Sequence, residues 1–166
     1  MKKKLKRYLP EILKDMNDRL NTFKSVVEYN SLSTKLKSEL ISNMFESSIS
    51  DIVPNAVAPL KDHEPDLFID IEPLELKTSK TTTTWRGGEY SKRPSNYLLV
   101  SYDDSEKDVK WFLLFTNLLK KDWKSSSSKS YYATSIDLNY IVENKNYEIL
   151  HGDIFKKRIK KHLKCL

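Results

Sequence analysis

The sequence predicts a mixed fold, α/β or α+β, in which helices flank a central mixed β-sheet. Two amphipathic helical patterns open the chain, several strand patterns follow, and a basic helical pattern closes it. With 166 residues, the chain can bury one sizeable core and is short for two ordinary domains. We therefore expect one domain over residues 1–166, with N-terminal helices in 5–49, a sheet in 65–138 and a C-terminal basic helix in 154–166.

The composition is typical of a folded protein in a reducing compartment. Hydrophobic residues make up 39% and charged residues 31% of the chain, which argues against disorder. The single cysteine, Cys165, excludes an internal disulfide and a cysteine-based zinc site. No apolar run suits a signal peptide or a membrane span, so we expect a cytoplasmic protein without a membrane partner.

The formal net charge of +6 is unevenly distributed along the chain. Eleven of the 29 lysines and arginines lie in residues 1–7 and 154–166, where no acid occurs. The segment between them holds 18 cations and 23 acids, a net charge of −5, so the total charge alone does not indicate a nucleic-acid partner. Within that segment, residues 77–93 carry five cations and one acid, which makes a local basic patch.

The first helix is predicted by apolar residues that recur with a 3.6-residue period over residues 5–27. Pro10 fits such a helix only near its first turn. The second helix is expected to begin at Ser33 or Thr34, since either residue can cap it. Its expected buried stripe consists of Leu36, Leu40, Ile41, Met44 and Phe45.

Strand patterns follow a proline-marked connection. The expected strands cover residues 66–71, 74–79, 96–103, 109–119 and 131–138. A tight turn at Glu72 and Pro73 is expected between the first two strands. Residues 124–130, which are rich in serine, are expected to form a short loop.

The first two strands carry an unusual cluster of acids, with five of them in the twelve positions 64–75. Because side chains alternate along a strand, Glu75 and Lys77 share one face. A two-residue turn at 71–72 would place Asp66 across from Lys77 on that same face. Burying these carboxylates without a partner would be costly, so we expect a cation to neutralise them.

Two carboxylates and one ammonium in this arrangement suit a divalent cation such as Mg²⁺, which prefers oxygen ligands. Lys77 could then orient a water or stabilise developing negative charge. The alternative is a cross-strand ion pair on an exposed face, which would contribute only about 0–1 kcal/mol. Asp70 shares the face of Asp66 and competes for its role, although its position favours a turn-flanking acid.

The pair Pro65-Asp66, followed after eight residues by Glu75-Leu76-Lys77, resembles the motif of the PD...(D/E)xK nuclease superfamily. The run ELKTSKTTTTWRGGEYSKR (75–93), which leads into YLLVSYD, is similar to that of small type II restriction endonucleases. The resemblance implies a restriction-endonuclease-like core and Mg²⁺-dependent hydrolysis of double-stranded DNA, leaving 5′-phosphates. It further implies a homodimer that acts at a short palindromic site.

By the matching positions, the resemblance implies that Asp66, Glu75 and the Leu76 backbone carbonyl bind the metal and that Lys77 is catalytic. Many members of the superfamily add an acid from an upstream helix. Glu46 is the candidate here and Glu39 its rival, and neither lies on the apolar stripe.

DNA contacts are expected mainly from residues 78–96, which supply hydroxyls, cations and glycines. The candidates are Lys80, Trp85, Arg86, Lys92, Arg93, Lys124 and Lys129. The alternative is a solvated polar loop that one tryptophan anchors to the core. The alternative functions are another nuclease of the same superfamily, such as a junction resolvase, repair or phage enzyme, and a non-catalytic DNA-binding module.

Overall fold

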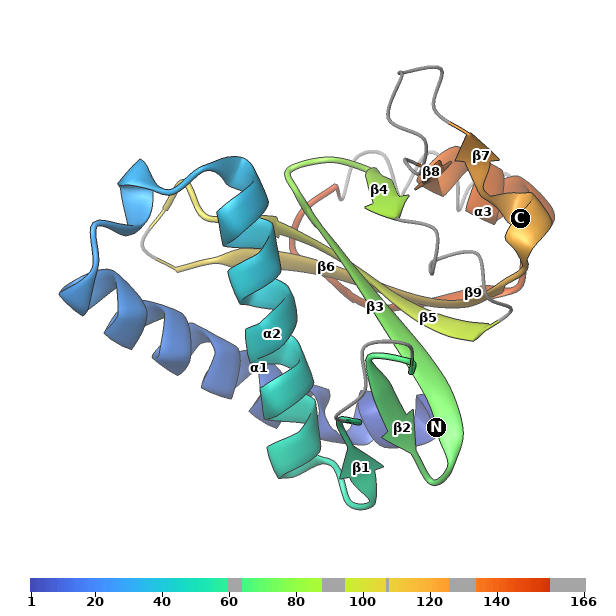
Figure 1. The fold of residues 1–166 in the computed structure, drawn as a ribbon, viewed down its shortest axis with the longest axis horizontal. Coiled ribbons are helices and arrows are strands. Elements are labelled where there is room, and N and C mark those ends of the chain that lie inside the picture. The colour runs from blue at the N-terminus through green and yellow to red at the C-terminus, as the bar shows by residue number, and fades with distance from the viewer. Residues whose placement is uncertain (60–63, 88–94, 107, 126–133, 156–166) are drawn as a thin grey trace.

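The computed structural model describes residues 1–59, 64–87, 95–106, 108–125 and 134–155, and its class is mixed α and β as expected (Figure 1). The helices are α1 (Lys2–Val26), α2 (Thr34–Ile52) and α3 (Leu138–Asn144), with the short 3-10 helices η1 (Tyr29–Ser31) and η3 (Lys120–Asp122). The strands are β1 (Ala56–Val57), β2 (Leu67–Ile69), β3 (Glu72–Lys80), β4 (Thr84–Gly87), β5 (Ser95–Asp103), β6 (Lys110–Leu118), β7 (Lys124–Ser125), β8 (Thr134–Asp137) and β9 (Tyr147–Gly152). Within the described residues, no helix is both long enough and apolar enough to cross a membrane.

A six-stranded sheet in the order β1-β2-β3-β5-β6-β9 forms the centre of the molecule. The β3–β5 pair is parallel and the other pairs are antiparallel. A parallel pair needs a crossover connection, and here the crossover contains β4, which joins β8 and β7 in a small antiparallel sheet. The helices α1 and α2 lie on one side of the large sheet, and the small sheet with α3 lies on the other (Figure 1).

Alternation along the central strands builds a hydrophobic cluster on each face of the large sheet. In β5, Leu98 and Val100 pack with the residues of α1 and α2, whereas Tyr97 and Leu99 pack with Trp85 of β4. The near-continuous apolar run of β5 is therefore explained by burial on both faces.

The first helix begins earlier than its apolar pattern predicts. Its expected inner face is confirmed, since the buried residues are Leu5, Leu9, Ile12, Leu13, Met16 and Leu20. Because α1 starts at Lys2, Pro10 lies inside the helix and not in its first turn. Proline has no N–H, so the carbonyl of Lys6 lacks its usual intrahelical donor.

The second helix has Ser33 as its N-cap, and the Ser33 hydroxyl accepts a hydrogen bond from the Leu36 N–H at 3.3 Å. The buried face of α2 extends further toward the C-terminal end of the helix than the predicted apolar stripe, to Ser48 and Ile49. Ile41 and Phe45 are buried as expected, while the side chain of Leu36 is 52% exposed. At the N-terminal end of α2, Thr34, Lys35 and Leu36 are therefore exposed, whereas Lys37 is buried.

The turn of the β2–β3 hairpin lies two residues earlier in the chain than the predicted turn at Glu72 and Pro73. Its turn consists of Asp70 and Ile71, both with positive φ (50° and 66°), so the predicted turn at Glu72 and Pro73 is wrong. Ile69 pairs with Glu72. When this register is continued by one residue beyond Leu67, Asp66 lies across from Glu75, whereas the prediction places it across from Lys77. A shift of two residues keeps every side chain on its expected face, so the predicted face of the cluster is retained.

The smaller elements were not predicted. β4 lies in the segment 78–96, which was expected to contact DNA and was assigned no strand at 84–87, and α3 and β9 follow the last expected strand. β8 lies within the strand expected at 131–138, of which 131–133 lie outside the described residues. Of the loop expected at 124–130, the first two residues form β7, and 126–130 also lie outside the described residues. The C-terminal helix expected at 154–166 lies, from residue 156 onward, outside the described residues.

The turn offers a test of local strain. Ile71 is 91% exposed and has a left-handed φ, which costs a β-branched residue about 1–2 kcal/mol. Ile71→Gly removes this cost and gives the Asp-Gly pair favoured in hairpin turns, so we expect the free energy of unfolding to rise by about 0.5–1 kcal/mol in urea titrations. The control is Val57→Gly, at an exposed strand position without positive φ, which should lower stability. A loss of stability in Ile71→Gly would contradict the strain.

Candidate active site

The acidic cluster lies at the edge of β3, beside the residue that precedes the start of β2. β2 pairs with residues 72–74 only, so among the described residues the edge of β3 along 75–80 has no strand partner on this side. Asp66 immediately precedes β2, and its Oδ2 accepts a hydrogen bond from the Leu76 N–H at 2.7 Å. The carboxylate thus satisfies a backbone donor that a longer β2 would otherwise have satisfied.

Lys77 lies between two carboxylates. Its Nζ is 3.4 Å from Asp66 Oδ2 and 3.3 Å from Glu75 Oε2. The side chain of Glu75 is 6% exposed and that of Lys77 17%, so the cluster is shielded and is not an exposed ion pair. The three residues predicted to converge therefore do so, although Asp66 and Lys77 are not direct cross-strand partners.

The electrostatics of the cluster favour additional positive charge. Burial raises the pKa of the Glu75 carboxyl, the charge of Lys77 opposes this, and the nearby Asp66 adds to it. The net shift is upward, which means that the Lys77 ammonium does not fully compensate the burial of Glu75 and the charge of Asp66. A further cation would stabilise the ionised form of Glu75.

The structure also brings Glu46 of α2 to this cluster. Burial, followed by the charge of Asp66, raises the pKa of Glu46 to about 7, while a hydrogen bond that Ser42 Oγ donates at 3.3 Å opposes the rise. The rival acid, Glu39, is instead 54% exposed and pairs with Lys35 at 3.6 Å. Of the two helix acids, Glu46 is therefore the one whose pKa depends on the charges of the cluster.

Asp70, the competitor of Asp66, lies in the hairpin turn, away from this arrangement. Its carboxylate accepts hydrogen bonds from Lys4 Nζ and, at 2.9 Å, from the Asn55 side-chain amide. The bond from Lys4, with that from Asn55, lowers the pKa of Asp70. Asp70 is therefore a residue of the turn itself, and its pairing with Lys4 ties the hairpin to α1.

The oxygen atoms of the cluster could form part of a magnesium coordination shell that waters and phosphate oxygens complete. Within the described part of the chain, no three His, Cys, Asp or Glu side chains are placed to hold a metal ion. Asp66 and Glu75 supply two carboxylates, and the Leu76 carbonyl points to the same edge of β3 as its N–H, as in any extended strand. Since Mg²⁺ usually takes one or two carboxylates with waters and phosphate oxygens, this donor set fits an open site.

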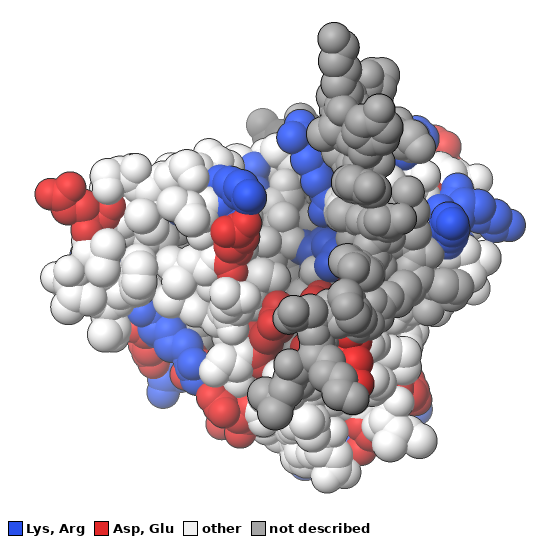
Figure 2. Space-filling model, viewed as in Figure 1, with Lys and Arg blue, Asp and Glu red and all other residues white. Residues whose placement is uncertain are grey.

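A groove with a volume of about 940 Å³ extends from the cluster along the free edge of β3. Side chains of α2 form one wall, and β3 with the start of β4 forms the other. Most of the lining residues carry a hydroxyl or a positive charge, and Asp66 and Lys77 are among them. On this face, Lys and Arg side chains form a column beside α2, with acidic side chains gathered below it (Figure 2).

The cations of the groove differ in how strongly they are held. Lys80 Nζ lies 2.6 Å from Asp104 Oδ1, and the Asp104 side chain is only 2% exposed. Arg86 is exposed and has no ion-pair partner among the residues that the structure describes. Lys80 is thus held by a carboxylate of the protein, whereas the exposed Arg86 meets no such carboxylate in the described part of the chain.

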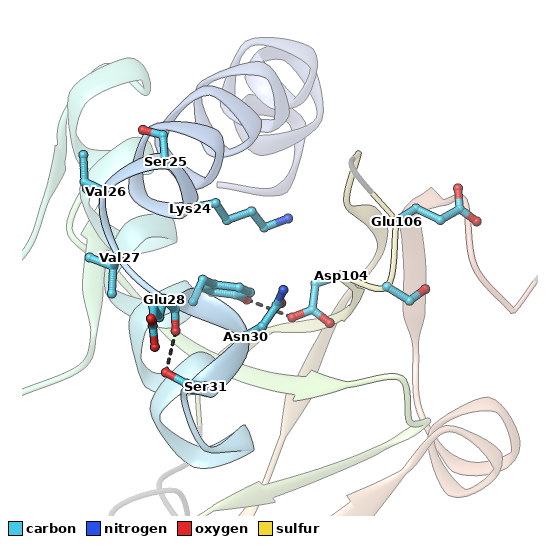
Figure 3. Close-up of a pocket in the computed structure, with 11 residues that line it drawn as sticks. Lys24, Ser25, Val26, Val27, Glu28, Asn30, Ser31, Asp104 and Glu106 are labelled. Carbon is cyan, nitrogen blue, oxygen red and sulfur yellow. Dashed lines mark hydrogen bonds between the residues drawn. The ribbon is translucent and has the colours of Figure 1, made fainter.

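A buried network behind the groove holds Lys80 in place, and nothing in the local sequence indicated it. Tyr29 Oη donates to Asp104 Oδ2 at 2.9 Å, in the wall of a separate hollow at the end of α1 (Figure 3). The ammonium of Lys37 lies 4.7 Å from the centre of the Tyr29 ring. Burial alone would raise the pKa of Asp104, but the bonds from Lys80 and Tyr29 hold it below its ordinary value.

Several predicted DNA contacts have other roles. Trp85 is fully buried and its Nε1 donates to the Val100 carbonyl at 2.9 Å, so its assignment as a DNA-binding residue is wrong and it anchors β4 to the core. Lys124 pairs with Asp137 at 3.4 Å, at the small sheet. The remaining candidates, Lys92, Arg93 and Lys129, lie outside the described residues.

The N-terminal lysines are also engaged within the chain. Lys2 and Lys6 both pair with Glu148 of β9, at 2.9 and 2.7 Å. The positive charge of this terminus is therefore partly neutralised against the sheet.

Comparisons with protein-family models and with curated proteins find no significant match to this chain.

The raised pKa of Glu46 predicts a pH-dependent cost. The folded protein keeps a proton that the unfolded chain releases above its ordinary pKa of 4.5, so stability should fall between about pH 4.5 and 7 and then level off. Glu46→Gln carries no charge, so we expect it to exceed the wild type by about 1–2 kcal/mol at pH 8, allowing for solvent screening, and to match it near pH 4.5. Urea denaturation at the two pH values measures this. Glu39→Gln is the control and should differ little at either pH, and equal stability of Glu46→Gln and wild type at pH 8 would contradict the burial.

The network around Lys80 predicts a loss of stability in Asp104→Asn. Asparagine cannot balance the Lys80 ammonium, so we expect the free energy of unfolding to fall by about 1–3 kcal/mol, less than for a fully buried pair because Lys80 is 30% exposed. The neighbouring Asp103→Asn retains an acceptor for the Ser105 N–H and should change stability by under about 0.5 kcal/mol. Equal effects of the two substitutions in urea titrations would refute the role of Asp104.

Proposed function

We propose that this protein is a Mg²⁺-dependent endonuclease that hydrolyses phosphodiester bonds of double-stranded DNA, of the type II restriction kind. The single observation that carries the proposal is the convergence of Asp66, Glu75 and Lys77 on β3, where Asp66 and Lys77 line a groove and the buried Glu75 lies behind them. Two acids that share one lysine in a shielded cluster are costly to maintain as structural elements alone, and a catalytic role accounts for them.

The residues that would hold magnesium are Asp66, Glu75 and the Leu76 carbonyl. A bound Mg²⁺ would polarise the scissile phosphate and lower the pKa of a water ligand. The raised pKa of Glu75 supports this assignment, because a carboxyl that burial disfavours as an anion gains most from a nearby cation.

The other side chains supply positioning and proton transfer. An ammonium has three N–H donors, and Lys77 directs two toward Asp66 and Glu75, which leaves one for a phosphate oxygen or an attacking water. Glu46, with a pKa of about 7, can accept or release a proton at neutral pH.

Action on both strands of a duplex requires two active centres. Each chain has one such cluster, so cleavage at a palindromic site follows naturally from a two-fold symmetric pair of chains. Another nuclease of the same superfamily would use the same cluster on branched DNA. The contacts of Lys77 with both acids also suit a DNA-binding module without catalysis, in which the three charges neutralise one another.

Incubation of a sequenced plasmid with the protein and Mg²⁺ separates these functions. We expect discrete fragments, and EDTA should abolish them. Preferential cutting of branched DNA would favour the alternative nuclease, and metal-independent binding without hydrolysis would favour the binding module.

The cluster itself is tested by Lys77→Ala and Glu75→Gln. We expect each to lower the cleavage rate by at least about 100-fold while still binding DNA, because the interactions removed act mainly in the transition state. Glu75→Gln keeps the shape of the side chain, so it remains informative if Lys77→Ala unfolds. Lys110→Ala is the control, since Lys110 pairs with Glu106 away from the groove and should cut like the wild type. Normal cleavage by folded Lys77→Ala would exclude the catalytic assignment.

A further inference from the structure

The groove continues beyond the acidic cluster and reaches β4. Asp66 and Lys77 line it together with Thr84 and Arg86, so the cluster and β4 open into the same hollow. A ligand that places one phosphate at the cluster would therefore extend along β3 toward β4. The two sides of the groove determine what kind of ligand that is.

The β4 side presents an exposed cation, Arg86, and a hydroxyl, that of Thr84. Thr84 and Arg86 are exposed on either side of the buried Trp85, so alternation directs both to the same face of the strand. The backbone of β4 is fixed by pairing with β8 and by the hydrogen bond of Trp85 to Val100. Arg86 therefore extends from a rigid strand and has no carboxylate partner among the described residues.

The α2 side presents a similar pair of residues. Thr34 and Lys35 line the groove at the start of the helix. The side chain of Lys35 is 85% exposed, and its contact with Glu39 at 3.6 Å is of the loose, solvent-screened kind that contributes little. An anionic strand in the groove would thus meet an available cation and a hydroxyl on each side.

We infer that this groove holds the sugar-phosphate backbone of the cleaved strand beside the scissile phosphate, gripped by Thr34 and Lys35 of α2 and by Thr84 and Arg86 of β4. This inference rests on the proposed function and adds α2 to the DNA-binding surface. Contacts to phosphates carry affinity and salt dependence without sequence preference. Lys80, which Asp104 holds at 2.6 Å, shapes the groove and does not contribute a phosphate contact.

The test is the salt dependence of DNA binding. Fluorescence anisotropy with a short labelled duplex in EDTA, over a series of salt concentrations, gives the slope of log K against log[salt]. Each neutralised phosphate contributes about 0.9 to that slope, so Lys35→Gln and Arg86→Gln should each reduce it by about 1 and the double variant by about 2. We expect the double variant to bind on the order of 10–100-fold more weakly at low salt.

Lys110→Gln is the matched control for loss of one surface charge outside the groove, and it should keep the wild-type slope. Both tested side chains are exposed, so circular dichroism should show intact folding of the variants. A double variant with the slope of the wild type or of the control would overturn the inference, even if the wild type cuts plasmid DNA. Reduced slopes without any cleavage would support the groove and refute the nuclease, and a wild type that neither binds nor cuts DNA would overturn both.

Discussion

The arrangement of the site depends on where the β2–β3 hairpin stops. Because β2 begins only at Leu67, the edge of β3 beyond Leu74 has no neighbouring strand in the described part of the chain, and the Asp66 carboxylate accepts the hydrogen bond of the Leu76 N–H. A hairpin longer by a few residues would cover this edge and fill the groove. The late start of one short strand thus gives the protein an acidic cluster, a backbone carbonyl and a hollow at one place on the sheet.

The ion pairs of the cluster compensate the burial of Glu75 only in part. Glu75 is buried and would be costly alone, and Lys77 reduces that cost without removing it, as the raised pKa of Glu75 indicates. Glu46 adds a third acid whose proton is held near neutral pH. Glu46 is therefore close to the balance between its protonated and ionised forms at neutral pH, and a bound cation would favour the ionised forms of both Glu46 and Glu75.

Periodicity was sufficient to predict the fold class, the two long helices, the central strands and the shared face of Asp66, Glu75 and Lys77. It could not predict the hairpin register, because Asp70 and Ile71 lack the glycine or asparagine signal of such turns and Ile71 adopts a strained φ. Likewise, pairings between residues far apart in sequence, such as Tyr29 with Asp104 or Lys80 with Asp104, arise only once the layers have packed. Short elements such as α3 and β9 carry too few residues for a clear period.

Trp85 illustrates how an internal residue governs an external one. Its indole is inserted between the sheets and bonded to Val100, and the next residue along the strand, Arg86, is exposed beside the groove. Replacement of this tryptophan would loosen the strand that carries the guanidinium, although the indole touches no solvent. In an alanine scan, Trp85→Ala would weaken DNA binding although Trp85 does not contact DNA, because the substitution loosens β4. The thermal stability of this variant should therefore be measured before its DNA affinity is interpreted.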